Sequence, residues 1–198
     1  PMSLKDYIEL YDVRSISMTT KNKPSKNSYN LLSKGKTLKM EYVGTPEEIW
    51  GDLSKEFKFT VDACASSKNH LVKRYWTKEN SALDKNWDNE VVYCHPMYDG
   101  KIPKFVKKSF EHNCLTVFLL PSSTNSVYFH KYFWDFSKHQ PKKNVEVRFL
   151  KKAKDLQHGY KMKTDEGVNP EYGYLRPLMV VVVDNRHILR GEDANDKK

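Results

Sequence analysis

Two stretches of this sequence are apolar almost from end to end over the length of one strand: LTVFLLP at 115–121 and LMVVVVD at 178–184. A strand with one face in water alternates apolar and polar residues, whereas a strand covered on both faces does not need to alternate. Helices packed on both faces of a sheet provide such cover. The two runs therefore predict an α/β protein.

Shorter apolar segments alternate with amphipathic ones along the rest of the chain. Strands are predicted at 59–64, 89–94 and 145–150, and helices at 45–57, 102–112 and 125–136. The first helix has Thr45 at the expected N-cap and Pro46 at the expected first helical position, where both residue types are common. This alternation predicts a three-layer sandwich with a mostly parallel sheet.

Composition divides the chain into three parts. Residues 1–41 are polar and rich in lysine, which indicates a basic arm or a solvated leader. Residues 42–190 hold the periodic segments and are predicted to form one domain, and residues 191–198 are expected to be a disordered tail. No apolar run approaches the roughly 18 residues that a membrane span requires, so we expect no membrane association.

The net charge and the spacing of the cysteines indicate which partners and which cellular compartment to expect. The net charge of +9, from 34 Lys and Arg against 25 Asp and Glu, favours a polyanionic partner such as nucleic acid, although a lysine-rich proteome gives the same balance. Cys64, Cys94 and Cys114 are too far apart in sequence for a CxxC pair. We therefore expect packed free thiols, no metal site and a reducing compartment, the cytoplasm or nucleoid.

Three polar loops follow predicted strands, at Asp62–Ser66, Cys94–Gly100 and Pro121–Thr124. Ligands of parallel α/β sheets bind beyond the carboxyl ends of the strands, so these loops predict a pocket. The carboxylate of Asp62 can accept hydrogen bonds from the amine or hydroxyl groups of a ligand. The alternative is that it caps a following helix. The HPMY loop (His95–Tyr98) offers an imidazole, a proline carbonyl and an aromatic face for a planar heterocycle, and its alternative is a simple turn.

The order and spacing of these motifs resemble the phage-type DNA N-6-adenine methyltransferases, the Dam-like phage family. The segments that carry the resemblance are TPEEIWGDLSKEF, FTVDACAS, RYWTKEN, YCHPMY, LLPSSTNSVYFH and VEVRFL. YCHPMY stands where the family has WCNPPY.

The resemblance implies a Rossmann-like fold and S-adenosylmethionine-dependent transfer of a methyl group to the N6 amine of a flipped adenine in double-stranded DNA. It also implies a donor site formed by Thr45, Pro46, Asp62, Ala63 and Glu79. His95, Pro96 and Tyr98 are implied to hold the base, with the imidazole and the proline carbonyl accepting the amine hydrogens.

Three departures from the family pattern leave two hypotheses. His95 replaces an Asn, Asp or Ser, Met97 replaces the second proline, and Ser81-Ala82 replace Asp-Gly. The chain is either an active methyltransferase with an altered loop or a non-catalytic descendant that binds nucleic acid or a protein partner. If His95 accepts an amine hydrogen, the rate falls as it protonates, near pH ~6.5 when its pKa is unperturbed.

A basic segment, KKAKDLQHGYKMKTDEGVNPEYGYLR at 151–176, lies between two predicted strands. Such enzymes often carry target-recognition loops at this place. The resemblance therefore implies DNA contacts by Lys151, Lys152, Lys154, Tyr160 and Arg176. The alternative is a β-hairpin that only covers the sheet.

Overall fold

The two long apolar runs pair with each other inside the sheet. In the computed structural model of the chain, strand β3 (Leu115–Pro121) lies antiparallel to strand β9 (Leu178–Asp184) along its whole length. The structure describes residues 44–98, 100–151, 160–164, 167–174 and 177–186. All of them fall within one compact unit of the chain.

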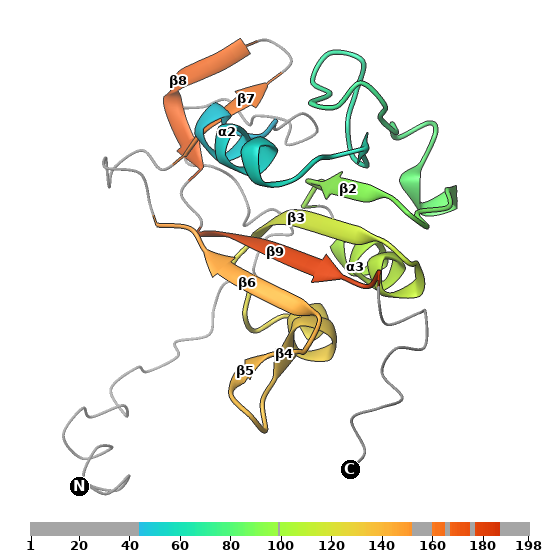
Figure 1. Cartoon of the computed structure of the whole chain (residues 1–198). Coiled ribbons are helices and arrows are strands. Elements are labelled where there is room, and N and C mark those ends of the chain that lie inside the picture. Colours follow the sequence, from blue (N-terminus) through green and yellow to red (C-terminus); the bar gives the residue numbers. More distant parts are fainter. Residues whose placement is uncertain (1–43, 99, 152–159, 165–166, 175–176, 187–198) are drawn as a thin grey trace, which may run out of the picture. The chain divides into compact units, whose positions relative to one another are not determined.

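Three further strands complete a sheet of order β1-β2-β3-β9-β6 (Figure 1). They are β1 (Val61–Asp62), β2 (Val91–Cys94) and β6 (Val145–Phe149). Strands β1, β2 and β3 are parallel, and β9 is antiparallel to both β3 and β6. Only β9 is therefore reversed within this sheet, which confirms the prediction of a mostly parallel sheet in an α/β protein.

Helices cover both faces of this sheet. They are α2 (Glu47–Glu56) on one face, and α3 (Ile102–Glu111) with the π-helical segment η4 (Phe129–Phe133) on the other. Alternate residues of β3 point to the two layers: Phe118 and Leu120 pack with α3 and η4, whereas Val117 and Leu119 pack with α2. The continuous apolar runs are thus buried on both sides, as predicted.

The start of the first helix differs from the prediction. Pro46 is the N-cap of α2, and Glu47 and Glu48 form its first turn, near the positive end of the helix dipole. The side chain of Thr45 caps no helix amide, and its hydroxyl lies against Tyr93 and His95 instead. The prediction of Thr45 as N-cap is therefore wrong, because buried polar partners compete successfully for its only hydroxyl.

The helix predicted at 125–136 is also much shorter. Helical conformation covers only 127–133, and the Trp134 amide donates to the Phe129 carbonyl in a wide π-helical turn. The chain then forms β4 (Trp134–Asp135), which pairs with β5 (Gln140–Pro141). Phe129 and Phe133 are both buried in the core, and the next two residues enter a β ladder instead of a further helical turn.

Two β-strands lie in the long basic segment. Strand β7 (Tyr160–Thr164) pairs with β8 (Gly167–Tyr174) in antiparallel register. Of the residues expected to contact DNA, Lys151 is exposed and Tyr160 begins β7. Lys152, Lys154 and Arg176 lie outside the described residues. The DNA contacts therefore stay a prediction.

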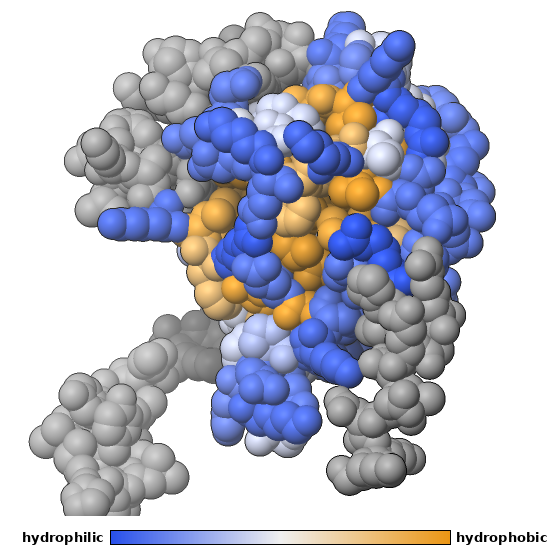
Figure 2. Space-filling view, in the orientation of Figure 1, coloured by the Kyte–Doolittle hydropathy of each residue, from blue (hydrophilic) through white to orange (hydrophobic). Residues whose placement is uncertain are grey.

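Polar and apolar side chains segregate on the surface seen in Figure 2. Apolar side chains gather over the middle of that face, and hydrophilic side chains surround them.

In the part of the chain that the structure describes, no helix is both long and apolar enough to cross a membrane.

A candidate ligand pocket beyond strands β1 and β2

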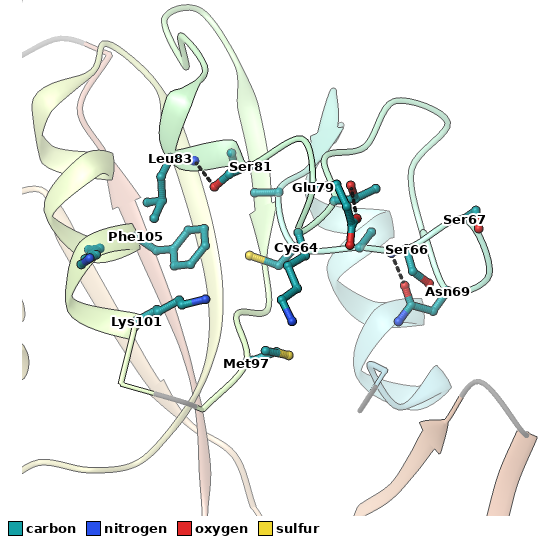
Figure 3. A pocket seen from close by; sticks show the side chains of 16 residues that line it. Cys64, Ser66, Ser67, Asn69, Glu79, Ser81, Leu83, Met97, Lys101 and Phe105 are labelled. Atoms are coloured by element: carbon teal, nitrogen blue, oxygen red, sulfur yellow. Dashed lines mark hydrogen bonds between the residues drawn. The ribbon is translucent and has the colours of Figure 1, made fainter. Parts of the chain in front are cut away.

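The loops after β1 and β2 meet because the two strands are parallel neighbours. Asp62 pairs with Tyr93, and the Ala63 amide donates to the Tyr93 carbonyl at 2.8 Å. A cavity of about 400 Å³ opens beyond these strand ends (Figure 3). Its position agrees with the rule for ligand sites in parallel sheets.

Three walls enclose this cavity, which we call the β1–β2 pocket. The loop at 63–67 contributes small side chains, and the segment at 77–83 contributes polar ones. The third wall is the start of α3, with Lys101, Lys104 and Phe105. Met97 of the HPMY loop also lines the pocket, so the two sequence motifs border one space.

Charges of opposite sign face the pocket from different walls. Glu79 accepts a hydrogen bond from the Thr77 hydroxyl at 2.9 Å, and Lys101 reaches toward the cavity from the α3 side (Figure 3). Hydrogen bonds from its own backbone amide and from Thr77 lower the pKa of the Glu79 carboxyl group. The pocket therefore offers a carboxylate and ammonium groups to a ligand that carries both charges.

Asp62 acts behind the pocket wall and is not one of its lining residues. Its carboxylate accepts hydrogen bonds from the Cys64 amide at 3.3 Å and from the Leu71 amide at 3.1 Å. Burial raises the pKa of Asp62 to about 6, and these two hydrogen bonds oppose the shift. Asp62 thus orders the loop that forms the wall, and no helix follows for it to cap.

His95 joins the HPMY loop to the chain before α2. Its Nδ1 atom lies 3.2 Å from Thr45 Oγ1, and its Nε2 atom lies 3.0 Å from Tyr98 Oη. The Thr45 oxygen lies 2.6 Å from Tyr93 Oη, so four side chains form one hydrogen-bonded chain. The expectation of a titration near pH ~6.5 applied to an unperturbed imidazole. Burial lowers the pKa of His95 to about 4, so the ring stays neutral well below that pH.

Two thiols lie beside each other between the two loops. Cys64 Sγ is 3.7 Å from Cys94 Sγ, and both cysteines are free. Cys64 lines the pocket, whereas Cys94 is fully buried immediately before His95. Among the described residues, no group of three or more His, Cys, Asp or Glu side chains is placed to hold a metal ion.

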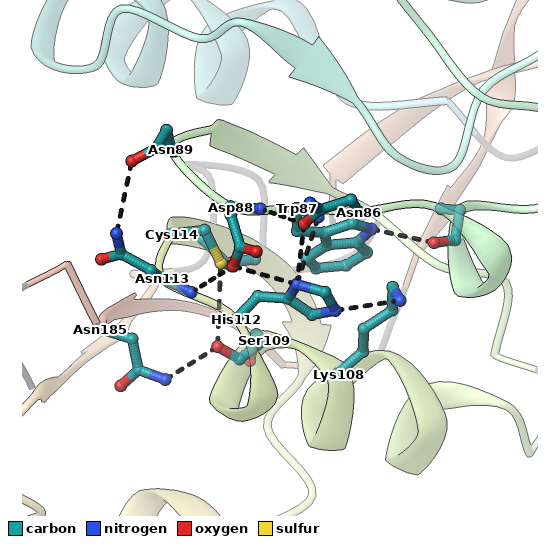
Figure 4. Close-up of polar contacts among 12 residues, drawn as sticks. Asn86, Trp87, Asp88, Asn89, Lys108, Ser109, His112, Asn113, Cys114 and Asn185 are labelled. Atoms are coloured by element: carbon teal, nitrogen blue, oxygen red, sulfur yellow. Dashed lines mark hydrogen bonds and ion pairs between the residues drawn. The ribbon is translucent and has the colours of Figure 1, made fainter. Parts of the chain in front are cut away.

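A second polar cluster lies at the other end of the strands. Asp88 accepts from the Asn113 amide at 2.8 Å and lies 3.2 Å from His112 Nδ1 (Figure 4). Asn185 donates to the Ser109 carbonyl at 2.9 Å. These contacts tie the end of α3 to the starts of β2 and β3. The cluster stabilises the fold at the amino ends of β2 and β3. Ligands of parallel sheets bind at the opposite edge, at the carboxyl ends of the strands.

The sequence of the chain matches a known protein family. A sequence model of the family described as DNA N-6-adenine-methyltransferase (Dam) matches residues 33–162, which include both pocket loops. The chain belongs to this family. The DNA N-6-adenine-methyltransferase of Escherichia phage T1 is 31% identical over 90 residues, 43% of this chain and 37% of that protein. The protein of the same name from Haemophilus phage HP1 (strain HP1c1) is 32% identical over 66 residues, 32% of this chain and 38% of that protein. The matched segments thus span well under half the length of either relative.

The departures from the Dam-family pattern have definite positions. Ser81 and Ala82 line the β1–β2 pocket, and Ser81 Oγ accepts from the Leu83 amide at 3.2 Å as the cap of the short helix η3 (Ala82–Asp84). Met97 lines the pocket as well. His95 is buried, 9% exposed, and stands two residues before Met97 in the sequence. Two of the three departures therefore contribute to the pocket lining.

The structure brings some predicted site residues together and separates others. Ala63 and Glu79 line the pocket, whereas Thr45, Pro46 and Asp62 are buried and are not among the described residues that line it. His95, Pro96 and Tyr98 adjoin it through Met97. Three residues that the sequence reasoning did not assign to a donor site, Lys101, Lys104 and Phe105, form one wall. The sequence feature that indicates these three residues is the predicted helix that starts directly after the HPMY loop.

The third predicted loop is absent from the pocket. The residues at 122–124 are not among the described residues that line it. The Ser122 amide donates instead to the Pro177 carbonyl at 2.8 Å. The pocket is therefore built from the first two loops and from α3.

Proposed function

We propose that this chain is a DNA adenine-N6 methyltransferase with a Rossmann-like fold that uses S-adenosylmethionine and acts on a base flipped out of double-stranded DNA. The observation that supports this most is the place of Met97, which belongs to the HPMY loop and also lines the β1–β2 pocket. A donor in the pocket and a base on the loop are then neighbours, as direct transfer between them requires.

The pocket residues suit the proposed donor. Small side chains at 63–67 let an adenosine approach the backbone, and the cavity of about 400 Å³ lies in the range of small-molecule sites. The Glu79 carboxylate can accept hydrogens from ribose hydroxyls or from the donor's amine, and Lys101 and Lys104 can attract its carboxylate. When bound, S-adenosylmethionine supplies an electrophilic methyl group on a sulfonium sulfur.

On the base side, Pro96 supplies a carbonyl oxygen that no described residue of the chain occupies by a hydrogen bond. This oxygen accepts one hydrogen of the target amine and turns the amine lone pair out of conjugation with the ring. Tyr98 provides an aromatic face for the base, and His95 borders the same position. Placing these groups around the amine is the contribution of the protein, since the transfer needs no strong nucleophile.

The charge of the chain suits the proposed DNA partner. A net charge of +9 attracts phosphates, and flipping a base costs only a few kcal/mol, which backbone contacts can offset. Lys151, Lys152, Lys154, Tyr160 and Arg176 are proposed to contribute to these contacts.

Incubation of mixed-sequence duplex DNA with isotope-labelled S-adenosylmethionine, followed by nucleoside mass analysis, tests this function. Wild-type protein should form N6-methyldeoxyadenosine. Ala65→Phe, which places a ring in the pocket, should form none, whereas Val127→Phe, at an exposed position outside it, should match wild type. Labelled N4-methyldeoxycytidine, or DNA binding without any methylation, would refute the proposal, and the second result would indicate a non-catalytic binding module.

A further inference from the structure

Both ring nitrogens of His95 have partners, and these partners decide which nitrogen carries the proton. Nδ1 faces Thr45 Oγ1 at 3.2 Å, and Nε2 faces Tyr98 Oη at 3.0 Å. The chain continues from Thr45 Oγ1 to Tyr93 Oη at 2.6 Å. A neutral imidazole has one N–H donor and one acceptor nitrogen, so the hydroxyl groups along the chain fix the tautomer.

The hydroxyl group of Tyr93 sets the direction of this chain. Tyr93 is 1% exposed and Thr45 is 3% exposed, so water is excluded from both hydroxyls. Among the described hydrogen bonds, Thr45 Oγ1 is the one partner of Tyr93 Oη. The Tyr93 hydroxyl must therefore donate to Thr45, because a buried hydroxyl hydrogen without an acceptor is strongly disfavoured.

The other arrangements each leave a buried group unsatisfied. If His95 Nδ1 carried the proton and donated to Thr45, the Thr45 hydroxyl would turn to Tyr93, and the Tyr93 hydrogen would lose its acceptor. If Thr45 accepted from both neighbours, its own hydrogen would lose its acceptor. A charged imidazolium is excluded at neutral pH because burial lowers the pKa of His95 to about 4. The remaining arrangement runs from Tyr93 to Thr45 to Nδ1, and it leaves the ring proton on Nε2.

We propose that Tyr93 and Thr45 are positioning residues that hold His95 as the Nε2–H tautomer, so that His95 donates a hydrogen bond to the target base. This inference rests on the proposed function. On the Watson–Crick edge of adenine, the N6 amine lies beside N1, which is an acceptor. The Pro96 carbonyl accepts from the amine while His95 Nε2–H donates to N1, once Tyr98 leaves Nε2 for the face of the base.

These two hydrogen bonds discriminate between bases by the donors and acceptors on the Watson–Crick edge of each base. Adenine and cytosine both present an amine beside an acceptor nitrogen, whereas guanine and thymine present a ring N–H that would face the His95 N–H. Two opposed donors are repulsive, and each is left without an acceptor. The replacement of a family Asn, Asp or Ser by His95 therefore changes the contact from acceptance of an amine hydrogen to donation toward the neighbouring ring nitrogen.

Nitrogen-15 NMR of the full chain with labelled histidine tests the tautomer without any need for activity. The His95 signals are assigned by their loss in His95→Gln. We expect a pyridine-type Nδ1 and a pyrrole-type Nε2 in wild type. Thr45→Val should produce a mixture of tautomers, because no hydroxyl group then donates to Nδ1. Tyr132→Phe, a partly buried tyrosine packed on Phe110, should leave the His95 signals unchanged.

A protonated Nδ1 in wild type, or a Thr45→Val spectrum identical to that of wild type, would overturn the positioning role. Either result leaves the proposed methyltransferase function unaffected. The two failures are therefore distinguishable.

Base analogues test the donated hydrogen bond. In mixed-sequence duplexes with adenine replaced by 1-deazaadenine, wild-type kcat/KM should fall by about tenfold, the effect of about one lost hydrogen bond. Replacement by 7-deazaadenine should cause little change. The loss of N1 in 1-deazaadenine also weakens its pairing with thymine and therefore eases flipping. If His95 makes no contact with N1, this analogue should be methylated faster than adenine. Unchanged or faster methylation of 1-deazaadenine would overturn the proposed contact, whereas absence of methylation on ordinary adenine would count against the function itself.

Discussion

His95 Nδ1 and Thr45 Oγ1 lie 3.2 Å apart, and this contact joins the HPMY loop to the residue before the cap of helix α2. The same hydroxyl lies 2.6 Å from Tyr93 Oη. One threonine thus links a helix start, a central strand and a loop beside the candidate pocket. This buried hydroxyl group is therefore one of the contacts that hold the loop in place.

Replacement of Thr45 by valine should lower the free energy of unfolding by about 1–3 kcal/mol, because the buried Tyr93 hydroxyl loses its acceptor. Thr45→Ser keeps the hydroxyl and should cost less. The double variant Thr45→Val/Tyr93→Phe should recover part of the loss, since it leaves no unpaired hydroxyl. Chemical denaturation of wild type, these three variants and the single variant Tyr93→Phe measures this. A double variant whose loss equals the sum of the single losses would show that the two hydroxyls do not interact.

Asp62 and His95 should affect the pH dependence of stability in opposite directions. The pKa of Asp62 is raised from 3.8 to about 6, so the folded chain binds its proton first as the pH falls, and stability rises. The pKa of His95 is lowered from 6.5 to about 4, so the unfolded chain binds its proton first, and stability falls. The two effects largely cancel in wild type between about pH 6 and pH 4.

Single replacements should uncover each effect. Between pH 7 and pH 4.5, Asp62→Asn should lose about 2 kcal/mol of stability relative to wild type, and His95→Gln should gain about 2 kcal/mol relative to wild type. Urea denaturation at the two pH values measures both. If both variants follow the wild-type pH profile, neither group has the altered pKa.

The thiols of Cys64 and Cys94 should form a disulfide under oxidation, since their sulfur atoms are 3.7 Å apart. With diamide as oxidant, each thiol gives up one hydrogen to the reagent and one S–S bond forms. Burial raises the pKa of Cys94 well above its usual range, so we expect a slow reaction that begins at the partly exposed Cys64.

Intact-mass and peptide analysis identify the cross-link. It should form in wild type and in Cys114→Ser, because Cys114 contacts Thr116 and the Ser109 carbonyl and neither of the other thiols in the described contacts. It should not form in Cys64→Ser. A cross-link through Cys114, or none in wild type, would contradict the arrangement of the two loops.

The sequence predicts the features of this fold that depend on local pattern. The continuous apolar runs at 115–121 and 178–184 require cover on both faces, and the structure has it. The rule for parallel strands also places the loops after Asp62 and Cys94 at one edge. These predictions need only residue type and periodicity, so one sequence is enough for them.

Contacts between distant side chains do not follow from such patterns. Thr45 has the sequence context of an N-cap, yet partners 48 and 50 positions away hold its hydroxyl. Lys101 and Lys104 lie far along the chain from Ala63, yet all three line the pocket because α3 starts at the sheet edge. The segment predicted as a helix at 125–136 is divided between η4 and β4 because its aromatic residues pack as a group.

Calorimetric titration with S-adenosylmethionine tests most directly whether the β1–β2 pocket is the donor site. Wild type should bind, Glu79→Gln should bind about tenfold more weakly through the loss of a charged hydrogen-bond acceptor, and Ala65→Phe should not bind. Glu111→Gln, which removes an exposed carboxylate paired with Lys107 on α3, should bind as wild type does. Equal binding by wild type and Ala65→Phe would place the donor elsewhere and contradict the account.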